Sequence, residues 1–132
     1  MASGCDRLIL GEVQDWTASK LVNYAAKANQ VLTTIHARSV EGAITRLQAL
    51  VTQDQDQTAA YLERTQKLAA QAFGLVVVCA RERLANDQVQ VFIKEIACLN
   101  PEGLNEVIFS GALDPTGEKV IFTDHRDDRA LR

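Results

Sequence analysis

Residues 58–84, TAAYLERTQKLAAQAFGLVVVCARERL, decide how the fold is interpreted. Apolar or small residues recur there at spacings of three, four and seven, which is typical of one apolar stripe along a helix. Glu63 and Lys67 lie on the polar side, in the favourable i,i+4 orientation of an ion pair. The pattern predicts a long amphipathic helix around which the rest of the chain packs.

The polar side of this stretch disappears at residues 75–78. A helix that is apolar on every side must be covered by neighbouring elements or by another copy of the chain. The alternative is a buried strand, because Val-Val-Val is β-branched and Gly74 is a plausible break. We favour the helix because the apolar stripe keeps its phase across Gly74.

The amino-terminal part predicts two further helices. Residues 1–11 form a flexible lead, and apolar residues then repeat at three and four over residues 12–37. Ser39 is a candidate N-cap for a second helix over residues 40–51. The polar tract TQDQDQ follows, and we expect a break near residues 54–57, since an unbroken rod would imply an intertwined oligomer.

Residues 87–97 carry two competing patterns. Asp87 and Gln90 match a capping box, and the pairs Phe92-Ile93 and Ile96-Ala97 share a helical face. The opposing interpretation is a strand, because QVQVFI alternates and is rich in β-branched residues. We favour a helix that ends by residue 99.

The carboxyl-terminal part predicts a β-hairpin over residues 104–124. Two β-rich runs flank the turn Asp114-Pro-Thr-Gly117, in which the glycine can adopt a left-handed conformation. Residues 125–132 form a charged tail. The segment VIFSGALDPTGEKVIFTD resembles the hairpin of PAS-like and cache-like sensor domains, but this short resemblance does not identify a family.

These elements predict one mainly α domain over residues 1–132. Its architecture is an antiparallel bundle of three to four helices, within residues 12–99, with a C-terminal β-hairpin. The alternative is an α+β fold in which the N-terminal helices pack on a four-stranded antiparallel meander. That alternative holds if residues 75–78 and 89–97 are strands.

Composition bounds the partners and the compartment. The formal net charge is −3 and no run of Lys and Arg is present, which argues against a nucleic-acid partner. The longest apolar run falls far short of the roughly 18 residues that a membrane-spanning helix needs. Three cysteines without a secretory signal favour a reducing compartment, so we expect a cytoplasmic protein with no membrane partner.

The histidines and cysteines do not form a catalytic pattern. His36 is interpreted as a helix-end cap, and Cys79 as a small core residue. His125 lies among three aspartates that could bind a cation weakly, namely Asp124, Asp127 and Asp128. No thiol, Cys5 and Cys98 included, has a CxxC partner or a nearby His.

Other catalytic signatures are missing from the sequence as well. There is no glycine-rich phosphate loop, GxSxG, HExxH or EF-hand loop. Glu95, Glu102 and Glu106 are scattered carboxylates without a defined geometry. We therefore predict no catalytic residue, cofactor or metal, and no enzyme.

The function that follows is a non-enzymatic protein–protein interaction or homo-oligomeric assembly module that acts through an apolar helix face. Its partner is another copy of the chain or another protein, and the expected interaction residues are Leu75, Val77, Val78, Phe109 and Phe122. The alternative is a small-ligand sensor whose pocket is lined by four aromatic residues, Trp16, Tyr24, Phe73 and Phe92. An enzyme that uses the carboxylates or His125 is a third option.

Overall fold

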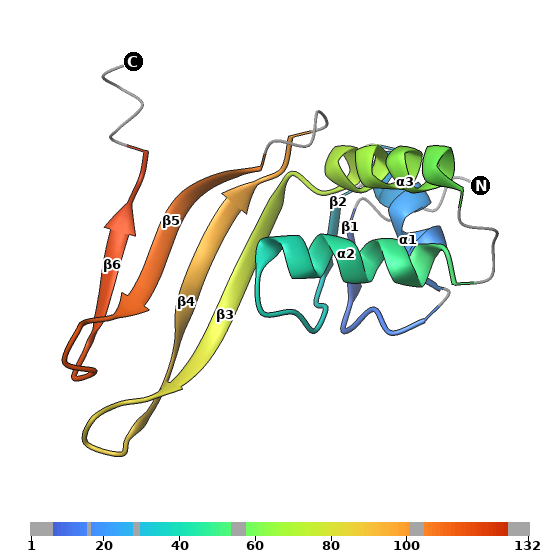
Figure 1. Cartoon of the computed structure of the whole chain (residues 1–132). Coiled ribbons are helices and arrows are strands. Elements are labelled where there is room, and N and C mark those ends of the chain that lie inside the picture. The colour runs from blue at the N-terminus through green and yellow to red at the C-terminus, as the bar shows by residue number, and fades with distance from the viewer. Residues whose placement is uncertain (1–6, 16, 28–29, 54–57, 101–104, 127–132) are drawn as a thin grey trace.

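The computed structural model describes residues 7–15, 17–27, 30–53, 58–100 and 105–126. Three helices and a small two-stranded sheet form one part, and a twisted four-stranded sheet extends from it (Figure 1). The elements in chain order are β1 (Arg7–Leu10), α1 (Thr17–Ala26), β2 (Gln30–Thr33), α2 (Val40–Val51), α3 (Ala59–Ala72), β3 (Leu75–Arg83), β4 (Val89–Cys98), β5 (Glu106–Leu113) and β6 (Val120–Asp124).

The helical part is built on a β1–α1–β2 crossover. β1 and β2 are parallel, with Leu8 opposite Val31 and Leu10 opposite Thr33. Parallel strands need such a crossover connection, usually a helix, and bury the face that the helix covers. Val13, Ala18 and Leu21 form the buried centre. Partly buried apolar residues of β1, β2 and α2 surround them, together with Phe73, which directly follows α3.

α2 connects the two parts of the molecule. Ser39 is its N-cap, as the sequence predicts, and the Ser39 hydroxyl accepts a hydrogen bond of 3.0 Å from the Gly42 N–H. At the start of the helix, Val40 packs with Val78 of β3 and Ala97 of β4 in a second buried cluster. The amino end of α2 thereby fixes the four-stranded sheet against the helices.

The larger sheet is an antiparallel meander with the strand order β3-β4-β5-β6. Its inner face, the side on which α2 packs, carries the buried side chains of Val78, Phe92 and Ala97. Residues 75–80 of β3 alternate between exposed and at least partly buried positions, as expected for a sheet that covers a core with one side. The other side is open in the described part of the chain.

The helices predicted for residues 75–84 and 87–97 are wrong, because these residues are β3 and β4. The two strands pair along their length, from Leu75 opposite Cys98 to Arg83 opposite Val89. Asp87, the expected capping-box residue, instead lies in the connecting turn with a φ of 65°. Cross-strand pairing of β-branched side chains outweighs the helical spacing here.

The helix predicted for residues 12–37 is also wrong. α1 covers only ten of these residues, and residues 30–33 form β2. The predicted flexible lead contains β1. Asp15 begins α1 by accepting a hydrogen bond from the Thr17 N–H at 2.9 Å, and the backbone and side-chain hydrogen bonds from Thr17 lower the pKa of the Asp15 carboxyl.

The mainly α bundle is therefore incorrect, and the fold is α+β. The four-stranded antiparallel meander of the alternative interpretation is present, although α2 meets it near β3 and β4 rather than covering it. The predicted helix over residues 40–51 is confirmed as α2. The break expected near residues 54–57 and most of the charged tail lie outside the described residues.

The predicted hairpin is confirmed as β5 and β6, with Gly117 at a φ of 72°. Asp114 organises the turn by accepting hydrogen bonds from the Thr116 hydroxyl at 2.8 Å and the Glu118 N–H at 2.9 Å. The Thr116 hydroxyl, with help from backbone N–H groups, lowers the pKa of Asp114 below its ordinary 3.8.

We expect the charge of Asp114 to make the turn pH-dependent. A carboxyl whose pKa is lowered by folding stabilises the protein above its unfolded pKa and loses this contribution as the pH falls. The Tm of Asp114→Asn should therefore lie below that of the native chain near neutral pH, and the gap should narrow as the pH falls toward about 3. Thermal unfolding across pH measures this, and a gap that stays constant would contradict it.

Candidate functional site

The carboxyl ends of β1 and β2 lie side by side at one edge of the small parallel sheet. Leu10 is opposite Thr33, so the chain leaves both strands at the same level. The Val13 N–H donates to the Thr34 carbonyl at 3.0 Å, and the Thr34 hydroxyl donates to the Gly11 carbonyl. This edge is where open α/β sheets commonly bind their ligands.

Glu12 is the central side chain of this edge. One carboxylate oxygen, Oε1, lies 2.8 Å from His36 Nε2, and the other, Oε2, accepts a hydrogen bond from Gln14 Nε2 at 2.6 Å. The Glu12 side chain is partly buried, whereas His36 is largely exposed. Two neighbours therefore orient one carboxylate, which is the kind of group that can accept a proton from a bound reactant.

The segment that follows β2 is tied to the larger sheet. Lys94, at the irregularity in β4, donates from Nζ to the Arg38 carbonyl at 3.1 Å. Arg38 lies two residues after His36 and directly before the N-cap of α2. This contact limits the freedom of the loop that carries His36.

A second candidate site is the outer face of the larger sheet, the side opposite to Val78, Phe92 and Ala97. Of the predicted interaction residues, Leu75, Val77, Phe109 and Phe122 belong to this face. Val78 does not, because alternation along β3 turns it into the core. The Phe109 and Phe122 rings stack with their centroids 5.5 Å apart.

The other reactive side chains considered from the sequence do not form a common site in the described part of the chain. His125 Nε2 lies 2.8 Å from the Ser110 hydroxyl, whereas Asp127 and Asp128 fall outside the described residues. Cys79 is exposed rather than buried, because it belongs to the outer face. Glu95 and Glu106 lie on opposite faces of the sheet, and Glu102 is not among the described residues.

The expected ligand pocket does not form from the named aromatic residues. Phe73 packs on the core of the helical part, whereas Phe92 is buried in the larger sheet. Tyr24 lies on α1, and Trp16 is outside the described residues.

Sequence reasoning missed Glu12 and His36. It assigned Glu12 to the first turn of a helix and His36 to the end of the same helix. The available signal was two short β-rich runs, residues 8–10 and 31–35, separated by an amphipathic stretch. Glu12 comes two residues after the first run, and His36 comes directly after the second. That pattern is typical of a βαβ unit.

Comparisons with known proteins find a matching family and a similar fold. The family model described as type II/IV secretion system protein matches residues 3–112. The fold is similar to the VirB11 ATPase from the Brucella suis type IV secretion system, solved in complex with sulphate, with a TM-score of 0.57 and 24% sequence identity. That match covers 69% of this chain and 27% of the ATPase, so the chain spans about a quarter of its length. No curated protein matches the chain.

These findings overturn the functional predictions. The family match and the structural likeness point to a secretion ATPase-type fold, not to a non-enzymatic helical interaction module or a small-ligand sensor. The prediction that the chain is not an enzyme is wrong for the same reason. Among the described helices, none is long and apolar enough to cross a membrane.

Proposed function

The chain belongs to the type II/IV secretion system protein family, and from this premise we propose that its β1–α1–β2 unit supplies the catalytic carboxylate of an ATP-hydrolysing site. The observation that supports the proposal most directly is the position of Glu12. This carboxylate follows β1 at the carboxyl edge of a parallel sheet and is held by His36 at 2.8 Å.

In the proposed reaction, a water oxygen attacks the γ-phosphorus of ATP and the bond from that phosphorus to the β,γ-bridging oxygen breaks. Glu12 orients the water and accepts its proton, and ADP leaves with the bridging oxygen. Such a step depends on positioning, because phosphoryl transfer asks little covalent chemistry of the protein.

His36 and Gln14 act as positioning residues in this proposal. Each contacts a different oxygen of the Glu12 carboxylate, so together they set its rotation. His36 lies just after β2, and Gln14 lies two residues beyond Glu12. The crossover therefore brings His36 to Glu12 and Gln14, which precede it by 24 and 22 residues in the sequence.

The phosphate-binding groups of the site come from outside these 132 residues. The sequence contains no GxxxxGK[ST] loop. The small sheet also has one open face, on which Ile9 is 75% exposed and Leu32 is 65% exposed. Purely parallel sheets are almost always covered on both faces, so this open face supports completion by a further part of an ATPase.

A chimera tests the proposal. Residues 1–132 replace the structurally matching segment of the VirB11 ATPase, and the remaining part of that ATPase supplies the phosphate-binding groups. We expect the purified chimera to bind magnesium ATP and to release phosphate in repeated turnovers. The isolated 132-residue chain should release none.

Two results would contradict the proposal that this chain supplies the carboxylate and a further part of an ATPase supplies the phosphate-binding groups. The first is turnover by residues 1–132 alone, which would place the phosphate-binding groups within this sequence. The second is a chimera that binds ATP but does not hydrolyse it. Nucleotide binding by the chimera serves as the check that it has folded.

The chain is also compatible with a homo-oligomer, as the sequence predicts and as membership of a secretion ATPase family allows. We therefore propose that it acts together with further copies of itself.

A further inference from the structure

We propose that Lys94 is a further positioning residue of the ATP-hydrolysing site, through which the larger sheet sets the orientation of His36 and thereby of Glu12. This role of Lys94 rests on the proposed role of Glu12 in hydrolysis. Two observations carry it, namely a β-bulge at Lys94 and the hydrogen bond that the Lys94 ammonium makes.

Lys94 is an extra residue in the pairing of β3 with β4. Val78 is opposite Glu95 and Cys79 is opposite Ile93, so no residue of β3 is paired with Lys94. Glu95 shares the inner face with buried Val78, and Ile93 shares the outer face with exposed Cys79. The alternation of faces therefore slips by one residue at Lys94. Such bulges re-aim side chains and are over-represented next to active sites.

The Lys94 side chain reaches the loop between β2 and α2. Its ammonium donates from Nζ to the Arg38 carbonyl at 3.1 Å. Arg38 directly precedes Ser39, the N-cap of α2, and α2 packs on the inner face through Val40. The hydrogen bond thus places the Lys94 ammonium on the inner face, where the two parts of the molecule meet.

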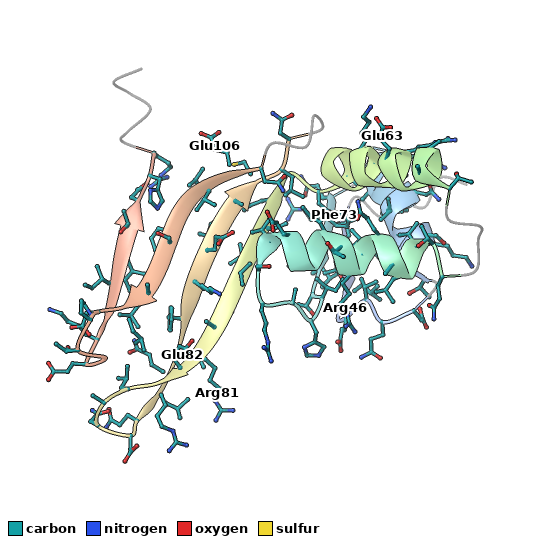
Figure 2. The ribbon with its side chains drawn as sticks, in the orientation of Figure 1. Arg46, Glu63, Phe73, Arg81, Glu82 and Glu106 are labelled. Carbon is teal, nitrogen blue, oxygen red and sulfur yellow. The ribbon has the colours of Figure 1, made fainter. Side chains whose placement is uncertain are left out.

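The bulge lies close to this junction. Val40 of α2 packs with Val78, the last residue of β3 before the shift in register. Beyond the shift, β3 runs away from the helices, and Figure 2 shows Arg81 and Glu82 near the end that is remote from α2. Lys94 therefore belongs to the part of the sheet that can act on the loop.

The loop of residues 35–38 has few other attachments. In the part of the chain that the structure describes, the Arg38 carbonyl is the only backbone group of this loop that forms a hydrogen bond, and Lys94 is the donor. Both residues are exposed, so water competes for this bond and its net contribution is modest. We therefore expect Lys94 to adjust the loop rather than to hold the fold together.

His36 is the side chain that this adjustment reaches. It is 81% exposed, so packing holds it weakly, and its Nε2 lies 2.8 Å from Glu12 Oε1. Arg38 is two residues further along the loop, so a shift of its carbonyl moves the backbone that carries His36. A misaligned Glu12 carboxylate accepts a proton from the attacking water less readily. Lys94 should therefore affect kcat and leave nucleotide binding little changed.

The His36 ring tests the contact without nucleotide. The sequence has two histidines, so NMR can follow the His36 ring in the 132-residue chain with His125 as an internal reference. Lys94→Met removes the donor and should shift the His36 signals, because they respond to the hydrogen bonds of the ring. Lys94→Arg keeps a donor and should leave them near their native positions. The matched control, Lys119→Met in the turn between β5 and β6, should change neither ring.

The VirB11 chimera tests the effect on hydrolysis. Lys94→Met should lower kcat about threefold to tenfold, the range for loss of one hydrogen bond, with KM for ATP within about twofold. Lys94→Arg should restore most of the activity, and Lys119→Met should keep all of it. In a His36→Ala chimera, Lys94→Met should change kcat by less than about twofold, because its effect passes through His36.

Three results would overturn this role of Lys94 while Glu12 keeps its own. They are a Lys94→Met chimera as fast as the unsubstituted one, an equal loss of kcat with and without His36, and His36 ring signals that Lys94→Met does not shift. Failure of the proposed function is a separate result, because it appears as full activity of a Glu12→Gln chimera, and it would remove the role of Lys94 as well. Circular dichroism and nucleotide binding confirm that the variants are folded.

Discussion

In the VirB11 chimera, Glu12→Gln should lower kcat for ATP hydrolysis by about 100-fold or more, the usual range for loss of a general base. The substitution keeps the size and hydrogen-bonding shape of the side chain, so contacts with His36 and Gln14 remain possible. The neutral amide cannot accept a proton from water. Phosphate release under saturating magnesium ATP measures kcat, and equilibrium nucleotide binding should change little.

The control for this substitution is Glu63→Gln. Glu63 lies on α3 in an exposed ion pair with Lys67, at 3.1 Å, far in sequence from the β1 edge. Such surface pairs contribute about 0 to 1 kcal/mol, so the control should hydrolyse ATP at the native rate. A Glu12→Gln chimera as fast as the control would remove Glu12 from the proposed reaction.

The second large effect concerns stability. We expect Val78→Asp to lower the free energy of unfolding by at least about 3 kcal/mol, because it places an unpaired carboxylate in an apolar core. Val78 is 5% exposed and packs with Val40 and Ala97, where α2 meets the larger sheet. Urea unfolding measures the loss, and a variant that is already unfolded in water gives the same result in its strongest form.

The adjacent residue provides the matched comparison. Val77→Asp changes the same side chain one position earlier, but Val77 is 47% exposed on the outer face. Val77→Asp should therefore lower the free energy of unfolding by less than about 1 kcal/mol. Equal losses for the two variants would contradict the assignment of β3 as a strand with alternating faces.

Capping residues, turn residues and apolar spacing in the sequence correctly predicted the elements that depend on interactions between neighbouring residues. Ser39 and the apolar spacing after it indicate α2, and Asp114 with Gly117 indicates the turn between β5 and β6. In both cases the residues that make the structure are within a few positions of each other. For residues 75–98 the sequence supported both helix and strand, and the strand alternative was the correct one.

The candidate active site was not predictable in this way. Glu12 and His36 are 24 positions apart, and their contact exists only because β1 and β2 pair in parallel around α1. Apolar residues happen to recur at helical spacing over residues 12–37. Periodicity alone does not distinguish a short apolar strand from a helix segment. Glu12 therefore appeared as a helix-terminal acid rather than as a strand-end carboxylate.

The sequence by itself determined the local elements whose hydrogen bonds close within a few residues, namely α2 and the last hairpin, together with the apolar character of residues 75–78. Only the tertiary structure decided that those residues are a strand, that Val77 and Val78 face opposite sides, and that Glu12 meets His36. The physical reason is that strand pairing is non-local. A strand gains its hydrogen bonds and its buried face from a distant segment, and neither is encoded in its own spacing.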